Sequence, residues 1–356
     1  MARTEVRSEA DLHNGFSDKL QPVQSLDLGK VRSVNDLVKG MSKTAFGARN
    51  LGEAADVLEA MAKDKDCFKV LTLSGAMTVA KMGLVVCDMI DNGMVDAVIS
   101  TGALMAHGLV EAAGMTHFKH DPAMSDEQLY EMGYNRVYDT LELEKNLDDT
   151  WNLLDKILSK VESDAVLSSH ELHRIIGGYL AENTPSESRA ILKSAYANNV
   201  PVYVPAFTDS ELALDFDIYN RLAESNGKKP IAFNAFKDLR DYSKRVADAK
   251  KIGIFTVGGG VPRNWAQQVA PYLEAVERRY PSLLKRGSAK KFFYAVRICP
   301  EPAFWGGLSG CTYSESVSWG KLVSRKEGGM QAEVFADATI AWPLIVKAVL
   351  ERMGKA

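Results

Sequence analysis

Short apolar runs alternate with helical patterns along most of this 356-residue chain. The runs are rich in β-branched and aromatic residues and end in small or polar ones, which is typical of buried strands. Helical patterns lie between them, and one of these ends at the turn signal Asn92-Gly93. This alternation predicts an α/β fold with a doubly wound, mostly parallel sheet and helices on both of its faces. The predicted strands span residues 68–74, 95–101, 200–207, 252–258, 292–298 and 332–336, and predicted helices span residues 77–90, 103–113, 149–161 and 266–279.

The length of the chain fits one large α/β domain or two smaller ones, and it contains no Pro/Gly/Ser-rich linker. We therefore predict a single domain over residues 31–356. Residues 1–30 are charged and carry few large apolar side chains, so we predict that they form an N-terminal arm. Residues 119–199 are longer than one crossover, and we predict that they form an insertion of helices on the same domain.

Composition and charge argue against several classes of protein. A net charge of −3 and the absence of a Lys/Arg-rich run argue against nucleic-acid binding and suit a cationic substrate. The four cysteines lack Cys-x-x-Cys spacing, so we expect reduced thiols, with no metal site and no disulfide framework. No apolar signal region and no run of 18 apolar residues occurs, which predicts a cytoplasmic protein.

Polar and small residues gather at the ends of the predicted strands. In open α/β sheets, ligands bind outside the carboxyl ends of the strands. Here those ends carry Ser74, Thr101, Asp209, Gly258–Gly260 and Asp337. Such residues also end strands and cap helices without any ligand, so no single strand end decides between the two interpretations.

Three consecutive glycines, Gly258 to Gly260, follow one predicted strand and precede Val261-Pro262. Proline is well placed to begin a helix there. This arrangement lets the backbone approach a phosphate and directs helix N–H groups at it. It is not the Gly-x-Gly-x-x-Gly fingerprint of ordinary dehydrogenases, and a tight strand-to-helix turn explains it equally well.

Lys321 ends the segment Ser314-Glu315-Ser316-Val317-Ser318-Trp319-Gly320-Lys321, which follows a glycine-rich stretch over residues 306–310. A lysine amine is a nucleophile only when it is unprotonated, so imine chemistry needs an apolar pocket that lowers its pKa. Trp319 is a candidate wall of that pocket, and its indole face can also bind an ammonium. Glu315 is a candidate anchor for a substrate ammonium. The alternative is an ordinary solvated lysine after a turn.

The segment ending at Lys321, followed by Val334-Phe335-Ala336-Asp337-Ala338-Thr339, resembles the active-site region of the deoxyhypusine synthase family. Further matching segments occur in the family's order and cover most of the chain from about residue 30 to 350. The resemblance implies a Rossmann-like fold and an NAD cofactor. The other matching segments are residues 72–78, 99–103, 204–209 and 258–262.

By the same resemblance, the residues that contact NAD lie at the strand ends. Asp209 and Asp337 are the expected ribose ligands, because a carboxylate accepts hydroxyl groups and would repel a 2′-phosphate. Helix capping is the alternative for these two aspartates. The full implied cofactor set is Ser74, Thr78, Thr101, Gly102, Asp209, Gly259, Gly260, Asp337 and Ala338.

The resemblance also implies the reaction, which is transfer of a 4-aminobutyl group from spermidine through an imine on Lys321 to an acceptor amine. Each step demands a dry pocket, since water hydrolyses imines. In this interpretation Lys321 is the covalent nucleophile, Trp319 covers the aliphatic chain and Glu315 anchors an ammonium. These three residues match the family without change.

Other positions of the implied substrate site depart from the family. Asn264 stands where the family has a histidine, and His107 stands where it has a glutamate. Trp305 and Leu308 replace an acidic pair, and each ammonium that loses a carboxylate partner costs several kcal/mol. Glu301, Asp215 and Asp217 are candidates to compensate. For His107 and Asn264 the alternatives are a helix-face histidine and an N-cap asparagine.

Two enzymatic functions follow from the resemblance. The first is a homospermidine synthase, in which putrescine accepts the aminobutyl group. The second is a true deoxyhypusine synthase, which modifies a lysine of a translation factor. The lost carboxylates favour the first, and the intact Lys321 argues against a non-catalytic NAD-binding protein. The resemblance also implies a homotetramer with active sites at subunit interfaces.

Overall fold

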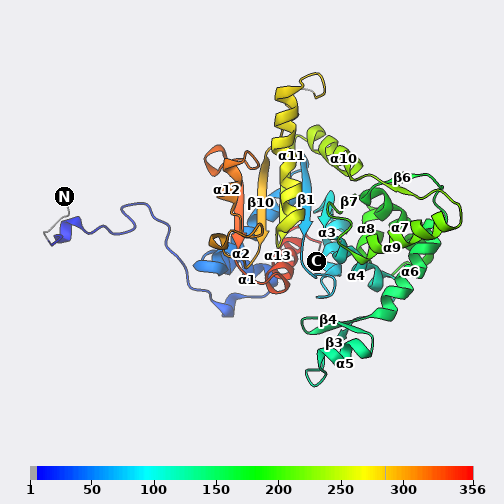
Figure 1. Cartoon of the computed structure of the whole chain (residues 1–356). Coiled ribbons are helices and arrows are strands. Elements are labelled where there is room, and N and C mark those ends of the chain that lie inside the picture. The colour runs from blue at the N-terminus through cyan, green and yellow to red at the C-terminus, as the bar shows by residue number, and fades with distance from the viewer. Residues whose placement is uncertain (1–5, 285, 356) are drawn as a thin grey trace.

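The computed structural model describes residues 6–284 and 286–355, and its centre is a six-stranded sheet (Figure 1). All neighbouring strands pair in parallel, in the order β11-β10-β9-β1-β2-β7. The prediction of an α/β fold with a mostly parallel sheet is therefore confirmed. The strands are β1 (Cys67–Leu73), β2 (Ala97–Ser100), β7 (Val202–Tyr203), β9 (Lys251–Val257), β10 (Phe292–Ile298) and β11 (Met330–Val334).

Helices cover both faces of this sheet, because its central strands are apolar on both sides. On one face Trp342 of α13 packs with residues of α2, α3 and the sheet. On the other face Tyr242 of α10 and Ala266 of α11 pack against Val70 and Ile254. The helices are α2 (Phe46–Lys63), α3 (Gly83–Asp91), α10 (Ala235–Asp248), α11 (Gly260–Arg279) and α13 (Ala338–Arg352), with α1 (Val34–Ser42) packed on α2 and α13.

The region between β2 and β9 contains more than the predicted insertion of helices. Three short strands form a separate antiparallel sheet in the order β3-β5-β4, beside α5 (Figure 1). The helical prediction is wrong for this part, which lacks the long amphipathic pattern of the helices after it. The elements of the region are α4 (Gly102–Ala112), β3 (Phe118–Lys119), α5 (Asp126–Glu131), β4 (Tyr134–Val137), β5 (Thr140–Leu143), α6 (Glu144–Leu158), β6 (Val166–Leu167), α7 (Ser169–Asn183), α8 (Ile191–Ala197), α9 (Glu211–Ser225) and β8 (Ala232–Phe233).

Three predicted elements are shorter than their sequence patterns suggest, and one of them, the strand predicted over residues 95–101, keeps only the four residues of β2. β7 keeps only two of the residues predicted for 200–207, because Pro201 and Pro205 lack the N–H that a ladder needs. The helix predicted over residues 77–90 begins only at Gly83. Before it, the chain makes turns in which Gly75 and Lys81 have positive φ angles of 79° and 63°.

Residues 6–30 are exposed along their length and extend away from the sheet in Figure 1. The segment joins the rest of the protein at its end, where the Gln24 N–H donates to the Lys43 carbonyl at 2.9 Å. No helix within the described residues is long and apolar enough to cross a membrane.

Candidate active site

Lys321 is fixed beside the first residue of β10. The helix α12 (Tyr313–Ser318) ends three residues before it, and Gly320 reverses the chain with a φ of 70°. The Phe292 N–H then donates to the Lys321 carbonyl at 2.9 Å, and Leu322 forms a bridge with Phe292. The backbone of Lys321 is therefore held at the amino end of β10, and its side chain projects along the sheet face that α11 covers.

The Lys321 ammonium has an amide as its partner. Its Nζ lies 2.9 Å from Oδ1 of Asn264 in the second turn of α11, and the residue is 8% exposed. Among the described residues, Lys321 forms no ion pair with a carboxylate. Burial lowers the pKa of Lys321, and the nearby Arg263 guanidinium lowers it further. Lys321 is thus the kind of amine that can act as a nucleophile.

A cavity of about 220 Å³ opens in front of Lys321. Its wall includes Trp319, whose ring centroid lies 5.8 Å from Lys321 Nζ. Glu315 and Asn264 line the same cavity, so four of the five residues predicted for the reaction meet there. The complete lining is Arg263, Asn264, Gln267, Gln268, Ala303, Gly306, Gly307, Leu308, Cys311, Glu315, Trp319 and Lys321.

Two buried arginines hold the glycine-rich loop that forms one side of the cavity. Arg263 donates to the carbonyls of Leu308 and Cys311, both at 2.7 Å. Arg297 donates to the carbonyls of Ser309 and Cys311, both at 2.8 Å, and pairs with Glu333. Neither arginine could be predicted from the sequence, because an arginine that binds backbone carbonyls leaves no motif. The loop is therefore positioned through its backbone.

The mouth of the cavity is aromatic and open. Trp319 is 63% exposed, and Trp305 and Phe304 on the neighbouring loop are 71% and 85% exposed. Phe304 and Trp305 contact each other edge to face, with ring centroids 6.1 Å apart. So much exposed aromatic surface at one mouth is typical of a surface that another molecule covers.

The positions that depart from the family lie in and around this cavity. Leu308 lines it, whereas Trp305 does not line it and is exposed between the lining residues Ala303 and Gly306. Glu301 packs against the glycine-rich loop, where a Cβ on Gly307 would overlap its carboxylate. The other two candidates to replace the missing carboxylates, Asp215 and Asp217, lie on α9 and do not line this cavity.

The residues predicted to bind the cofactor lie at the carboxyl edge of the sheet. Ser74 follows β1, and its Oγ accepts a 2.9 Å hydrogen bond from the Gly259 N–H. Thr101 precedes α4 and Gly259 precedes α11, and neither helix has a side-chain cap. Since β2 and β9 flank β1, two uncapped helix N-termini lie on either side of Ser74. Unpaired N–H groups at such ends suit an anionic ligand.

The remaining cofactor candidates differ in what their side chains do. The Thr78 hydroxyl donates to the Leu104 carbonyl at 2.9 Å, which ties the turn after β1 to α4. A side chain at Gly102 would overlap Ser210, so packing alone already requires glycine there. Gly260 begins α11 with a φ of 56°, and Ala338 is the first residue of α13.

Asp209 and Asp337 lie at opposite edges of the sheet. Asp209 follows β7 and Asp337 follows β11, so five strand spacings, about 24 Å, separate the two strand ends. Asp337 also caps α13, because its Oδ1 accepts from the Thr339 N–H at 2.7 Å. Asp337 therefore serves as the N-cap of α13, as the helix-capping interpretation of the sequence expects.

The cofactor edge and the Lys321 cavity adjoin. A Cβ on Gly259 would lie 2.7 Å from the Cα of Ser309, in the loop that Arg263 and Arg297 hold. The triple glycine therefore allows close contact between the sheet edge and the cavity wall. Close packing against Ser309 is therefore a sufficient reason for a glycine at position 259, whether or not a phosphate binds beside it.

His107 does not line the Lys321 cavity within one chain. It lies on α4, and its Nδ1 is 3.1 Å from Oε2 of the buried Glu142 on β5. A role for His107 in substrate binding stays a prediction.

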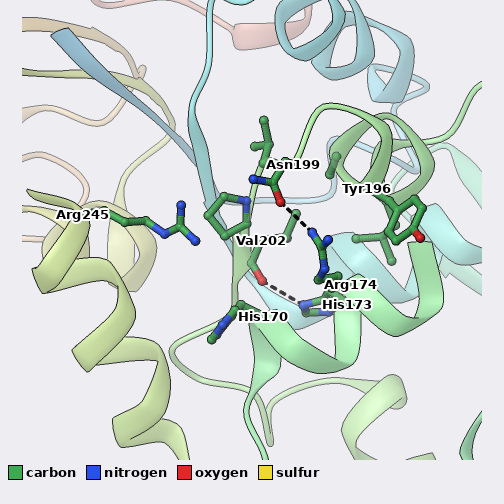
Figure 2. A pocket seen from close by; sticks show the side chains of 11 residues that line it. His170, His173, Arg174, Tyr196, Asn199, Val202 and Arg245 are labelled. Carbon is green, nitrogen blue, oxygen red and sulfur yellow. Dashed lines mark hydrogen bonds between the residues drawn. The ribbon is translucent and has the colours of Figure 1, made fainter. Parts of the chain in front are cut away.

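A second hollow lies beyond the edge strand β7, between α7, α8 and α10 (Figure 2). Arg174 and Arg245 face it, and Arg174 donates to Oδ1 of Asn199 at 2.8 Å. His173 donates from Nδ1 to the Val202 carbonyl at 3.1 Å, and its burial lowers its pKa to about 4. None of the residues predicted for catalysis or cofactor binding lines this hollow.

Comparison with known proteins agrees with the motifs. The family profile of deoxyhypusine synthase matches residues 36–349. The "Probable deoxyhypusine synthase 2" of Methanosarcina mazei is 34% identical over 340 residues, which cover 96% of this chain and 92% of that protein. The "Deoxyhypusine synthase-like protein" of Chlorobaculum parvum is 33% identical, over 91% of this chain and 88% of that protein.

A solved structure shows the same fold. The crystal structure of a "putative deoxyhypusine synthase from Entamoeba histolytica" superposes with a TM-score of 0.58 at 15% identity. The match covers 92% of this chain and 96% of that one.

Proposed function

The chain belongs to the deoxyhypusine synthase family of transferases, and on that premise we propose that it is an NAD-dependent aminobutyltransferase that makes homospermidine. In the proposed reaction, a 4-aminobutyl group moves from spermidine to Lys321 and then to putrescine. Modification of a lysine on a translation factor is the second candidate, because several relatives carry the name of that activity.

The observation that carries this proposal is the environment of Lys321. Its amine is buried, hydrogen-bonded to the neutral amide of Asn264 and shifted to a lower pKa. A lysine that served only stability would gain from a carboxylate partner and from water. A buried amine beside a neutral acceptor is instead prepared to lose its proton and attack a carbon.

The cavity residues have distinct tasks in this reaction. Unprotonated Lys321 attacks the imine carbon of the oxidised substrate, and 1,3-diaminopropane leaves. Asn264 holds the attacking nitrogen in place through its Oδ1. Glu315 binds the far ammonium of the aminobutyl group, and the indole of Trp319 covers its methylenes. Arg263 keeps the loop wall closed behind Leu308.

The carboxyl edge of the sheet fits a dinucleotide. The uncapped N-termini of α4 and α11 would face its pyrophosphate, and Asp209 or Asp337 would accept ribose hydroxyls. When bound, NAD would supply a hydride acceptor for the carbon beside the secondary amine and a hydride donor for the final imine. The contact between Gly259 and Ser309 supports this placement, since it brings the cofactor edge next to the Lys321 cavity.

The choice of putrescine rests on the apolar part of the cavity. Leu308 lines the wall where the family has a carboxylate, and Glu315 is the one carboxylate among the lining residues. An ammonium without a partner is costly to bury, so a small acceptor with few charges loses least here.

We also propose that the active enzyme is a homotetramer with its active sites at subunit interfaces. The exposed rim of Trp319, Trp305 and Phe304 supports this, because imine chemistry requires that water be excluded from an otherwise open mouth. The placement of Asp209 and Asp337 after opposite edge strands supports it too, since a cofactor bound between two chains could meet one aspartate from each chain.

Product analysis tests the proposed acceptor. Purified protein is incubated with NAD and spermidine, with either putrescine or a translation-factor protein bearing an acceptor lysine, and products are separated by chromatography. We expect homospermidine to form faster than any modified lysine. Rapid deoxyhypusine formation without homospermidine would show that the acceptor is the protein lysine and not putrescine.

A further inference from the structure

A buried cluster of two histidines and a glutamate lies between α4 and the small antiparallel sheet. His107 is on α4, His117 is on the segment that leads into β3, and Glu142 is on β5. The ligand atoms that these three residues offer all lie within 4.8 Å of one another. Glu142 is only 1% exposed, and both imidazoles are largely enclosed.

One oxygen of Glu142 is the centre of this cluster. Its Oε2 lies 3.1 Å from Nδ1 of His107 and 2.6 Å from Nε2 of His117. Despite that short distance, Nε2 of His117 is poorly directed and has no hydrogen bond among the described residues. No group fits between two atoms 2.6 Å apart, but a small rotation of either side chain would let both bind one ion, and a buried ring nitrogen without a hydrogen bond needs a partner of that kind.

The surroundings of Glu142 prepare it as a metal ligand. Its other oxygen, Oε1, accepts from the Asn146 side chain at 2.8 Å and from the Leu143 N–H at 3.2 Å. A carboxylate whose second oxygen is held by hydrogen-bond donors is the usual arrangement around a bound metal.

We propose that His107, His117 and Glu142 form a binding site for one zinc ion. Two imidazoles and a carboxylate are ligands that Zn²⁺ takes readily, and three protein ligands leave its fourth position for water. Tetrahedral zinc separates its ligand atoms by about 3.4 Å. The two observed separations need to open by less than about 1 Å, which small side-chain rotations provide. The site is separate from the Lys321 cavity and does not depend on the proposed reaction.

Lys81 controls access to this site. Its Nζ lies 2.8 Å from Nδ1 of His117 and 2.6 Å from Oε1 of Glu111. An ammonium beside Nδ1 keeps that nitrogen unprotonated and so places the imidazole proton on Nε2. Zinc needs Nε2 free and the proton on Nδ1. Metal binding therefore displaces Lys81 from His117, and Glu111 holds the released ammonium.

Zinc would also join parts of the chain that are otherwise loosely attached. The small sheet packs on α6 through β5, and the three ligands would tie β5 and the start of β3 to α4 as well. We therefore expect zinc to raise the melting temperature of the full chain.

The test uses the full-length, tag-free protein stripped with a chelator. Zinc is titrated in competition with a chromophoric chelator, and Co²⁺ is titrated separately while visible absorption is recorded. We expect one zinc per chain and the intense bands of four-coordinate Co²⁺. His107→Ala should weaken zinc binding at least about 100-fold, since it removes a ligand rather than an outer partner. Lys81→Met should strengthen binding.

His120→Ala is the matched control, because His120 lies near the cluster and bonds to the Met124 carbonyl instead. It should keep the affinity of the unchanged protein. The proposal is overturned if the unchanged protein binds no zinc, if His107→Ala binds as well as the control, or if both variants lose zinc equally. A six-coordinate Co²⁺ spectrum would also overturn it, and that measurement needs no variant to fold.

Discussion

Asn264→Asp places a carboxylate against the Lys321 amine without changing the shape of the side chain. In the unchanged protein, Nζ of Lys321 and Oδ1 of Asn264 are 2.9 Å apart. Two unit charges about 4 Å apart attract by about 4 kcal/mol at an effective dielectric constant of about 20. Because the cavity is open to solvent, we expect roughly half of this, about 2 kcal/mol, to act on Lys321. At 1.36 kcal/mol per unit, the pKa of Lys321 should rise by about 1.5.

The effect should appear in the rate of imine formation. With NAD and spermidine present, borohydride reduces the imine on Lys321 to a stable adduct, which mass spectrometry measures. In Asn264→Asp we expect this rate to fall about 30-fold at neutral pH, because less amine is unprotonated. The midpoint of the pH–rate curve should move to higher pH by about 1.5 units.

Asn264→Leu is the control for this prediction. It removes the same hydrogen bond without adding charge, so the midpoint of its pH–rate curve should equal that of the unchanged protein or lie at lower pH. If Asn264→Asp leaves the midpoint unchanged or lowers it, protonation of Lys321 does not limit the reaction, and the assigned role of its low pKa is wrong.

Three further predictions concern packing and charge. Gly259→Ala should lower the free energy of unfolding by about 1–3 kcal/mol and weaken NAD binding in calorimetry, because the new Cβ meets the Ser309 backbone at 2.7 Å. Arg263→Met should cost about 2–4 kcal/mol in denaturant unfolding by freeing two loop carbonyls, and should raise the Lys321 pKa. The folded-state pKa of Glu142, about 2, lies below its ordinary 4.5, so its stabilisation is present above pH 4.5 and is lost as pH falls toward 2. Glu142→Gln in metal-free protein should therefore lower the free energy of unfolding by on the order of 2 kcal/mol at neutral pH and by little below pH 2. An equal loss of stability at both pH values would contradict the lowered pKa of Glu142.

The central sheet could be predicted from the sequence because its strands are buried on both faces. Such strands read as continuous apolar runs, and the run predicted over residues 292–298 coincides with β10. The small antiparallel sheet was missed because β3 and β4 are short and partly exposed, so they lack that signal. The length of β7 was overestimated because the run of apolar residues continues past the prolines that end the hydrogen-bonded pairing of this strand.

The site was predictable only where its residues follow one another in a motif. Glu315, Trp319 and Lys321 stand together in the sequence, and the family resemblance added Asn264, which is 57 residues from Lys321. The loop-holding Arg263 and Arg297 act through backbone carbonyls, which no side-chain pattern reveals. The cluster around Glu142 was invisible for another reason. Its ligands stand at positions 107, 117 and 142, without the close spacing that marks a metal motif.

Mapping the trapped adduct shows whether Lys321 is the residue that carries the aminobutyl group. The protein is incubated with NAD and spermidine, reduced with borohydride, digested and sequenced by mass spectrometry. We expect one added aminobutyl group on Lys321 and none in Lys321→Ala. An adduct on another lysine, or its persistence in Lys321→Ala, would contradict it, as would the absence of any adduct in protein that binds NAD and turns over spermidine.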